Sequence, residues 1–255
     1  MLAEERKRKI IDIIEKNHIV KVSDLSKRFQ TTEATIRRDL EMLQGQGKVR
    51  RIHGGAVFTN PVTKDASYSE LSTLRIGEKK QIARLASSFV HEGDTLLMDG
   101  STTVYELAKL LVESSLTGIS VITNSFHLMG LFVDSSIRAI HTGGELFSGM
   151  NYATGTITEQ MLQGIRVDKC FMGANGIEPS YGYSVPSFGD ASVKKYMLRA
   201  SRVSFVLADH TKFAESYMAK FAGFDGEINY LITDSLPEGI SMEGSSTHLL
   251  LADSQ

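Results

Sequence analysis

The sequence is poor in features that would assign it to a class of protein at once. Its 255 residues hold one cysteine, Cys170, so neither a disulfide framework nor a thiolate metal site can be assembled within the chain. Cys170 falls in an apolar stretch, where a buried thiol is inert. The seven histidines are scattered without the spacing of metal ligands, so we expect no metal site and no cofactor.

Long apolar runs are also lacking. No window of about 18 apolar residues occurs, so we expect no membrane-spanning helix and no membrane partner. The first residues are charged and lack the apolar core of a signal peptide. The sequence shows no internal repeat and no low-complexity segment. These absences favour a globular, cytoplasmic protein.

Charge divides the chain into two unequal parts. Up to Phe58 there are 13 Lys and Arg against 8 Asp and Glu, a net charge of +5, whereas the remainder has 15 against 22, a net charge of −7. The overall charge of −2 conceals this division. A basic part gains free energy by displacing counterions from phosphates, and an acidic part is repelled by nucleic acid. The two parts are therefore expected to have different roles.

Residues 23 to 56 have the pattern of two short helices, a polar turn and a basic hairpin. In the second helix three apolar residues share one face at i, i+4 and i+7, namely Ile36, Leu40 and Leu43. The opposite stripe carries Ala34, Arg37, Arg38 and Glu41. We expect the apolar face to pack inward and the arginines to point outward, so that this helix can enter a major groove.

The flanking segments complete this domain. Ser23 is placed to cap the first of the two helices, and Thr32 to cap the second. The first helix is expected to bury Leu25 and Phe29, and an earlier amphipathic helix carries a stripe of Ile10, Ile13 and Ile14. Residues 48–55 are a basic strand that ends in two glycines. Three helices and such a wing predict a winged helix-turn-helix domain over residues 1–57.

This part of the chain resembles the DeoR family of bacterial sugar-operon repressors. The resemblance is carried by Thr35-Ile36-Arg37-Arg38-Asp39-Leu40 and by His53-Gly54-Gly55-Ala56. It implies that double-stranded operator DNA is the partner of the domain. The residues expected to contact DNA are Ser23, Thr32, Glu33, Ala34, Thr35, Arg37, Arg38, Lys48, Arg50, Arg51 and His53.

After a polar connection at residues 58–78, the region 79–255 alternates between helices and strands. Helices are predicted at 81–90, 103–113, 125–133, 158–163 and 191–201. Strands are predicted at 95–99, 120–124, 138–141, 169–172, 203–208, 230–233 and 248–251. Nearly continuous Val, Ile, Leu and Phe in these strands indicate an α/β domain with a largely parallel sheet covered on both faces.

Polar loops follow several of these strands, at the edge where such sheets bind ligands. Residues 99–103, Asp-Gly-Ser-Thr-Thr, leave one strand and open a helix, so glycine, hydroxyls and a helix N-terminus meet there. Other strand ends carry Asn124, Gly143-Gly144, and Asp209 with Lys212. Hydroxyls, amides, glycines and one or two cations suit a small phosphorylated polyol.

These loops resemble the sensor domain of the DeoR family, which is similar in fold to ribose-phosphate isomerases and binds sugar phosphates. The resemblance implies that residues 101–103 hold phosphate, that Lys212 supplies positive charge, and that Asp99 and Asn124 contact sugar hydroxyls or order the loops. The expected effector-binding residues are Asp99, Gly100, Ser101, Thr102, Thr103, Asn124, Gly143, Gly144, Lys194, Asp209 and Lys212. The chain departs from the family pattern at Ala214, where glycine is usual.

Two other functions compete with a sensor. A sugar-phosphate isomerase-like enzyme fused to the DNA-binding module needs a carboxylate base, for which Asp99, Asp190 and Asp209 are candidates. Asp99 and Asp209 end strands, however, where an ordinary role is to accept hydrogen bonds from loop amides. A purely oligomerising domain would leave the polar loops without a purpose. We expect instead a carbohydrate-operon repressor without catalytic residues. It binds operator half-sites as a homodimer or homotetramer and responds to a phosphorylated sugar.

Overall fold

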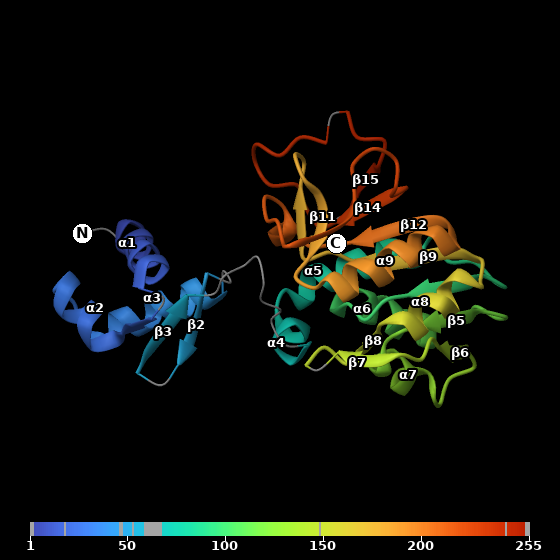
Figure 1. The fold of residues 1–255 in the computed structure, drawn as a ribbon, viewed down its shortest axis with the longest axis horizontal. Coiled ribbons are helices and arrows are strands. Elements are labelled where there is room, and N and C mark those ends of the chain that lie inside the picture. The colour runs from blue at the N-terminus through green and yellow to red at the C-terminus, as the bar shows by residue number, and fades with distance from the viewer. Residues whose placement is uncertain are drawn as a thin grey trace. The chain divides into compact units, whose positions relative to one another are not determined.

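The computed structural model describes residues 3–17, 19–45, 48–52, 54–58, 68–147, 149–242 and 244–252. The chain forms two compact units, Met1–Lys64 and Asp65–Gln255. Figure 1 shows the ribbon of both units and labels most of their helices and strands. Within the described ranges, no helix has the length and apolar character needed to cross a membrane.

The first unit packs three helices against a small antiparallel sheet. Its elements are α1 (Ala3–Asn17), β1 (Ile19–Lys21), α2 (Val22–Phe29), α3 (Glu33–Gly45), β2 (Val49–Ile52) and β3 (Gly55–Phe58). The strand order is β1-β3-β2, and both pairs are antiparallel. The β2–β3 hairpin is the predicted wing, and the short strand β1, which the sequence pattern does not predict, extends it. The expected winged helix-turn-helix is confirmed.

The apolar stripes predicted for the helices form the core of this unit. Ile10 and Ile14 of α1 and Ile36 and Leu40 of α3 are fully buried, and Leu25 of α2 is buried with them. In α1 and in α3 the two buried residues are four positions apart and so lie on the same face of the helix. Burying that face removes both side chains from water together. This core fixes which face of α3 remains outside.

One charged residue of α3 also faces inward. The carboxylate of Asp39 accepts two hydrogen bonds from the guanidinium of Arg6, at 2.6 Å from Nε and 3.2 Å from Nη2. The exposed fractions of the two side chains are only 5% and 13%. Such bidentate pairs are directional, so this one fixes the rotation of α3 against α1.

The second unit is built on a parallel sheet. Its elements are α4 (Tyr68–Thr73), α5 (Ile76–Ser87), β4 (Thr95–Met98), α6 (Thr102–Glu113), β5 (Ser120–Thr123), α7 (Phe126–Phe132), β6 (Arg138–His141), β7 (Glu145–Phe147), β8 (Tyr152–Thr154), α8 (Thr156–Gln163), β9 (Val167–Gly173), β10 (Gly176–Glu178), β11 (Gly182–Val185), α9 (Phe188–Ala200), β12 (Ser201–Leu207), a 3-10 turn (His210–Lys212), β13 (Ala219–Ala222), β14 (Tyr230–Thr233) and β15 (His248–Leu251). Seven strands form a sheet in the order β15-β14-β12-β9-β4-β5-β6, with every neighbouring pair parallel.

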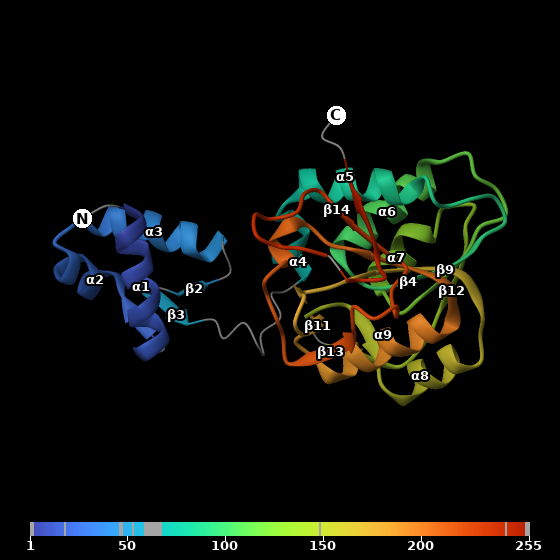
Figure 2. The ribbon, with the colours of Figure 1, turned by 90° about the horizontal axis from the view of Figure 1, so that it is seen from above.

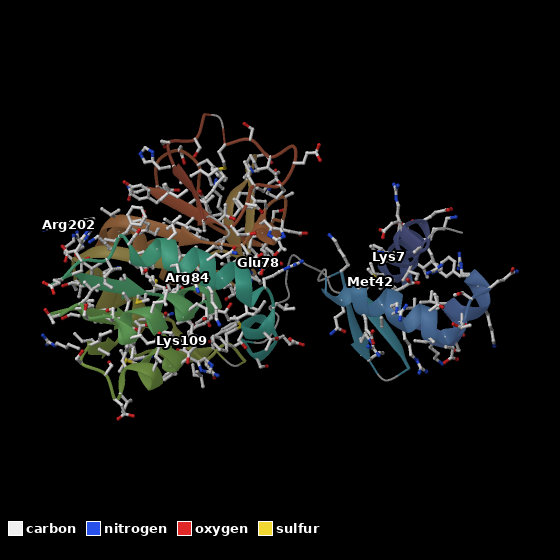
Figure 3. All side chains as sticks on the ribbon, turned by 180° about the vertical axis from the view of Figure 1, so that it is seen from behind. Lys7, Met42, Glu78, Arg84, Lys109 and Arg202 are labelled. Atoms are coloured by element: carbon white, nitrogen blue, oxygen red, sulfur yellow. The ribbon has the colours of Figure 1, made fainter. Side chains whose placement is uncertain are left out.

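Helices cover both faces of this sheet, as the sequence predicts. Figure 2 shows α5 and α6 on one face and α8 and α9 on the other. Successive strand residues alternate between the two apolar layers: Leu96 and Met98 of β4 pack with α5 and α6, and Leu97 packs with α9. In Figure 3, Arg84 and Lys109 mark the outer side of the α5–α6 layer.

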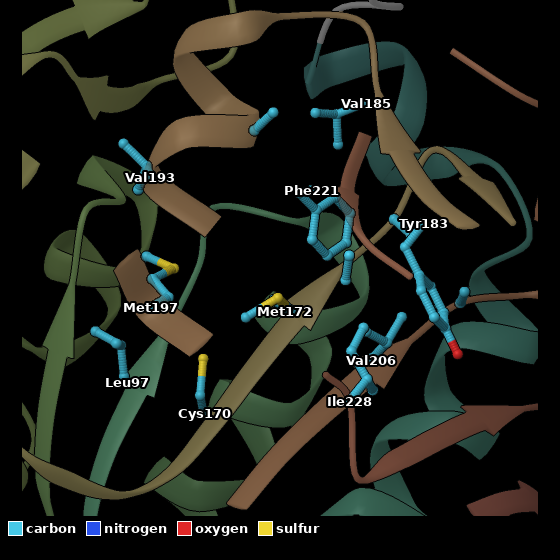
Figure 4. Packing of buried hydrophobic residues seen from close by; sticks show 14 of the residues in the cluster. Leu97, Cys170, Met172, Tyr183, Val185, Val193, Met197, Val206, Phe221 and Ile228 are labelled. Atoms are coloured by element: carbon cyan, nitrogen blue, oxygen red, sulfur yellow. The ribbon is translucent and has the colours of Figure 1, made fainter. Parts of the chain in front are cut away.

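Cys170 lies within the apolar layer beneath α9. Figure 4 shows its thiol among Leu97, Met172 and Met197. The side chain is fully buried. Burial raises the pKa of the Cys170 thiol well above its usual value, and the nearby Asp99 carboxylate adds to this effect. The residue is therefore a packing group with little thiolate character.

The structure departs from the prediction at the start of the second unit. The sequence predicts a connection through residue 78, but α4 and the beginning of α5 fall within that range. The helix predicted from residue 81 begins at Ile76. The polar run from Gly77 to Lys80 conceals this first turn, because Lys79 is buried there by contacts with other elements.

Several short antiparallel strands also escape the prediction. They form the β7–β8 hairpin and a three-stranded sheet in the order β10-β11-β13. Each of these strands has only three or four residues, which is too short for a period-2 pattern to stand out in a sequence.

Candidate functional site

The outer face of α3 carries the predicted DNA-contacting stripe. Ala34, Arg37 and Arg38 are exposed, as predicted, and the Arg37 guanidinium lies 3.0 Å from a carboxylate oxygen of Glu33, one turn earlier. Met42, labelled in Figure 3, is 49% exposed on the same helix. With its inner face anchored, α3 presents two cations and short side chains to solvent, which is the arrangement of a recognition helix.

The two predicted caps have different outcomes. Thr32 caps α3, because its hydroxyl accepts a hydrogen bond from the Thr35 amide at 3.2 Å and lies 2.9 Å from the Thr35 hydroxyl. The prediction of Ser23 as a cap is wrong. Helix α2 begins at Val22, whose amide donates to the carbonyl of Gly54 in the wing turn at 2.9 Å, so a backbone group replaces the expected side chain.

The wing is tied to α3 through Arg51. Its guanidinium lies 2.5 Å from a carboxylate oxygen of Glu41, and its amide donates to the Gln44 side chain at 3.0 Å. Both partners belong to α3, so β2 and α3 present one continuous surface. Lys48 precedes β2 and is exposed. His53 and the side chain of Arg50 lie outside the described residues, so their predicted roles stay predictions.

A pocket opens at the carboxyl ends of the central strands of the second unit. Together with open solvent at its mouth, it comprises about 610 Å³ of empty space. The loops after β4, β9 and β12 contribute most of its wall, together with α4, α5 and α9. Its lining residues are Leu71, Lys79, Asp99, Gly100, Ser101, Thr102, Thr103, Met150, Tyr152, Gly173, Ala174, Asn175, Asp190, Lys194, Leu207, Ala208 and Lys212. Seven of the eleven predicted effector residues are therefore brought together.

An ion pair forms the floor of this pocket. Lys194 of α9 donates to Asp99 and, at 3.1 Å, to the carbonyl of Gly173. Asp99 also accepts from the amides of Ser101 at 2.9 Å and Gly173 at 2.8 Å. Burial alone would lower the pKa of Lys194, but the carboxylates of Asp190 and Asp99 outweigh it and raise that pKa. Asp99 thus orders the loops, one of the two roles expected for it.

The N-terminus of α6 supplies open hydrogen-bond donors. The hydroxyl of Ser101 caps the helix by accepting from the amide of Val104 at 3.3 Å. Among the described residues, no acceptor is bonded to the amides or hydroxyls of Thr102 and Thr103, both of which line the pocket. Gly173 permits the close approach of the neighbouring loop, since a Cβ there would lie 2.6 Å from the Cβ of Ser101. This is the geometry in which helix N-termini bind anions.

Lys79 is a pocket residue that the sequence pattern does not single out. It is 3% exposed, and its ammonium donates to the carbonyl of Leu71 in α4. Burial lowers the pKa of Lys79 to about 8, although the Asp209 carboxylate opposes the shift. Lys212, at the end of the 3-10 turn, is half-buried at the same pocket. In the sequence Lys79 looks like its exposed neighbour Lys80, and no pattern distinguishes the two.

Four predicted effector residues are not part of the pocket lining. Asn124 donates to the carbonyl of Ala153 at 2.8 Å and so holds β8 in place. The carbonyl of Gly143 accepts from the Thr158 hydroxyl at 2.7 Å, and a Cβ on Gly144 would lie 2.1 Å from that hydroxyl. Asp209 accepts from the Thr211 amide at 3.0 Å. All four stabilise loops, and their contact with a ligand stays a prediction.

The carboxylates near the pocket are poorly suited to abstract a proton from carbon. Both oxygens of Asp99 are already hydrogen-bonded, and Asp190 faces the Lys194 ammonium at 3.9 Å. Burial alone would raise the pKa of Asp209, but Lys212, Thr211 and Lys79 hold it below its ordinary value. A general base needs a pKa near the working pH. Within the described residues no cluster of His, Cys, Asp and Glu is arranged to hold a metal ion.

Comparison with known proteins agrees with the division into two units. A model of the DeoR-like helix-turn-helix domain matches residues 6–62, and a model of the DeoR C-terminal sensor domain matches residues 74–235. The chain is 36% identical over 236 residues to the uncharacterized HTH-type transcriptional regulator YulB of Bacillus subtilis (strain 168), covering 92% of this chain and 90% of that protein. It is 32% identical over 238 residues to the lactose phosphotransferase system repressor of Streptococcus mutans serotype c, covering 92% and 93%.

Among solved structures, a D-ribose-5-phosphate isomerase in complex with phospho-erythronic acid matches 53% of each chain, with 17% identity and a TM-score of 0.41. A winged helix-turn-helix domain joined to a sensor domain defines a DNA-binding transcriptional regulator. The chain belongs to the DeoR family of such regulators, whose relatives are named as regulators and repressors and not as enzymes.

Proposed function

We propose that this protein represses a carbohydrate-metabolism operon, and that a phosphorylated sugar bound in the pocket of the second unit modulates its binding to operator DNA. The observation that carries the proposal is the convergence of two kinds of group on one pocket. The open N-terminus of α6 offers amides and hydroxyls, and Lys79 and Lys212 offer positive charge. Phosphate esters need both kinds of group.

The charge balance of the pocket supports a phosphate-bearing ligand. Three lysines line it, and two carboxylates, Asp99 and Asp190, lie together at one of them, Lys194. Lys79 and Lys212 line the same pocket as Thr102 and Thr103 and interact with one further carboxylate, Asp209, which lies outside the lining, so the two lysines bring a net positive charge to the pocket. The name of one relative, a lactose phosphotransferase system repressor, supports a sugar as the remainder of the ligand.

The proposal is tested by thermal unfolding of the full chain with a panel of sugar phosphates and the matching free sugars. At about 100 times its dissociation constant, the right phosphorylated sugar stabilises the protein by about 2.7 kcal/mol. For a domain of this size the melting temperature then rises by about 5–11 °C. Equal shifts from phosphorylated and free sugars contradict the phosphate site.

Two conservative variants locate the site. Thr102→Val keeps the shape of the side chain but removes its hydroxyl, and Lys212→Met keeps the stem but removes the charge, so both are expected to abolish the shift. Lys80→Met, on the exposed side of α5, is the matched control and retains it. A full response in both pocket variants places the phosphate elsewhere.

The regulatory half of the proposal is tested on DNA. An operator duplex selected from a randomised pool is titrated with the protein, with and without the sugar phosphate that stabilises it. If the sugar phosphate changes the affinity of the protein for DNA by some factor, linkage requires that DNA change the affinity of the protein for the sugar phosphate by the same factor. Melting shifts without any change in DNA affinity contradict modulation. Conversion of the sugar phosphate to an isomer selects the enzyme instead.

A further inference from the structure

Lys79 is buried, and in the described part of the chain no carboxylate is bonded directly to its ammonium. Lys79 is 3% exposed, and among the described residues its ammonium donates one hydrogen bond, to the carbonyl of Leu71. An ammonium has three N–H donors, so two remain for other acceptors. No ion pair involving Lys79 occurs in the described part of the chain. Asp209, Glu106 and Glu78 act on it only at longer range.

A buried charge of this kind is costly and is normally paired. Lys194 shows the paired case in the same pocket, with Asp99 hydrogen-bonded to it and Asp190 at 3.9 Å. Lys194 therefore has little positive charge left for a ligand. Lys79 lines the pocket and, within the described residues, has donors that are not hydrogen-bonded, so it is the buried cation with which an anionic ligand would form an ion pair.

The carbonyl that accepts from Lys79 belongs to a short helix, α4. Helix α4 has six residues, and the carbonyls of its last turn lack intrahelical partners. The Ser72 hydroxyl donates to Ser69, the Thr73 hydroxyl to Glu70, and the Lys79 ammonium to Leu71. A helix of this length is not stable by itself, so these side-chain contacts hold its C-terminal turn.

Helix α4 is also the first element of the second unit and part of the pocket wall. Leu71 lines the pocket, and the amide of Tyr68 donates at 3.2 Å to Gly149, next to the lining residue Met150. The ring of Tyr68 stacks on His127 with centroids 3.8 Å apart. The residues that follow the first unit therefore enter the second through a helix that touches the pocket.

On the basis of the proposed function, we propose that Lys79 is a phosphate ligand of the pocket. We propose also that its charge-assisted bonds to phosphate, which are stronger than a bond to a neutral carbonyl, move the ammonium toward the phosphate and away from the carbonyl of Leu71. Effector binding then removes a cap from α4 and loosens the helix through which the chain enters the sensor domain. Tyr68 remains stacked on His127, so the loosening is confined to the C-terminal turn of α4.

Amide hydrogen exchange of the full chain tests this coupling, with inorganic phosphate and each stabilising sugar phosphate as probes and chloride at equal ionic strength as the reference. A ligand ordinarily slows exchange where it binds. Here the amides in the C-terminal turn of α4 are expected to exchange about fivefold faster with ligand, the factor that corresponds to loss of about 1 kcal/mol of hydrogen bonding. The amides at the N-terminus of α6 are expected to slow.

Two variants separate the two parts of the proposal. Lys79→Met is expected to show fast α4 exchange without any ligand and to bind the sugar phosphate at least tenfold more weakly. Lys212→Met loses affinity as well, but its ligand-free α4 exchange matches that of the unmodified chain, because in the described part of the chain the Leu71 carbonyl accepts from Lys79 and not from Lys212. Lys80→Met changes neither quantity. The exchange of the unmodified chain decides the coupling even if Lys79→Met fails to fold.

The outcomes distinguish this inference from the proposed function. If a sugar phosphate raises the melting temperature while α4 exchange stays the same or slows, the coupling through Lys79 is overturned and the effector site stands. If Lys79→Met binds with unchanged affinity, Lys79 is not a ligand. If no phosphorylated compound shifts melting or exchange, the proposed function fails together with the inference.

Discussion

Lys194 and Asp99 form a buried ion pair that joins α9 to the end of β4. Their side chains are 5% and 4% exposed, and they lie 95 residues apart in the sequence. The same carboxylate holds the amides of Ser101 and Gly173, so a single group sets the positions of two pocket loops. The pair therefore has a structural role in the pocket, and the two charges neutralise each other.

Breaking this pair from one side is expected to destabilise the protein strongly. Lys194→Met and Asp99→Asn should each lower the free energy of unfolding by about 3–5 kcal/mol, because each leaves a buried partner without its counter-charge or hydrogen bond. The double variant should cost less than the sum by about 1–3 kcal/mol. Urea unfolding measures all three. Lys195→Met, exposed on the next position of α9, is the control, and strict additivity would contradict the pairing.

The arginine stripe of α3 makes a second prediction. Arg37→Ala with Arg38→Ala should leave the free energy of unfolding within about 1 kcal/mol, because both side chains are exposed. Specific operator affinity should fall by at least about 30-fold, since each base contact is worth about 1–3 kcal/mol. Circular dichroism and gel shift measure the two effects. The pair Arg84→Ala and Lys109→Ala, on the outer side of the α5–α6 layer, should bind DNA normally.

Arg51 of the wing is expected to act on phosphates. If it contacts one, Arg51→Met should reduce the slope of log affinity against log salt by about 0.9, and the loss should be similar for operator and non-specific DNA. Loss of its contact with Glu41 costs little, because a half-exposed pair contributes at most about 1 kcal/mol. A salt slope equal to that of the unmodified protein would remove Arg51 from the DNA-binding surface.

Much of the fold follows from the period of apolar residues. Ile36 and Leu40 predict the inner face of α3 because residues four positions apart lie on the same side of any helix, whatever it packs against. The strands around Leu97 and Cys170 are recognisable because parallel strands buried on both faces are apolar throughout. Loops that follow such strands meet at one edge of the sheet, which is why the sequence alone predicts that residues 99–103 and Lys212 share one pocket.

What the sequence does not reveal depends on partners far away in the chain. Asp39 sits between polar neighbours and looks exposed, but Arg6 on another helix buries it. Lys79 and Lys80 are adjacent lysines, and only the packing of α4 makes the first a buried cation. Lys194 carries the right charge for a phosphate, but its pairing with Asp99 spans 95 residues. Long-range pairing of charges has no periodic signature.

Ala214 offers a prediction about backbone strain. Its φ is +57°, a left-handed conformation that costs an L-residue about 1–2 kcal/mol, and its amide is held by the carbonyl of Ile177 at 3.0 Å. Glycine, which the family pattern favours here, adopts this conformation freely. Ala214→Gly should therefore raise the free energy of unfolding by about 1 kcal/mol and the melting temperature by about 2–4 °C. A lower melting temperature would show that the loop is held without strain.

The lowered pKa of Lys79 predicts how binding of the sugar phosphate depends on pH. Its pKa is about 8 in the ligand-free protein, and the charged groups that face it are Asp209, Lys212, Glu106 and Glu78. A bound phosphate dianion favours the protonated ammonium, so affinity should be highest below pH 8 and should fall by up to about tenfold per pH unit above it. A phosphate ester loses its second proton near pH 6, so above pH 8 the ligand stays a dianion and its own titration does not contribute to the fall in affinity.

Stability of the ligand-free protein should change in the opposite direction. Between pH 8 and the unfolded value near 10.5, the unfolded chain binds more protons at Lys79 than the folded chain, so the free energy of unfolding rises with pH. Titration calorimetry from pH 7 to 9 and urea unfolding over the same range measure the two slopes. Lys79→Arg keeps its charge throughout and should show neither slope, because a guanidinium does not titrate here. If the binding of a stabilising sugar phosphate to the unmodified protein is independent of pH from 7 to 9, Lys79 is not the cation that receives the phosphate.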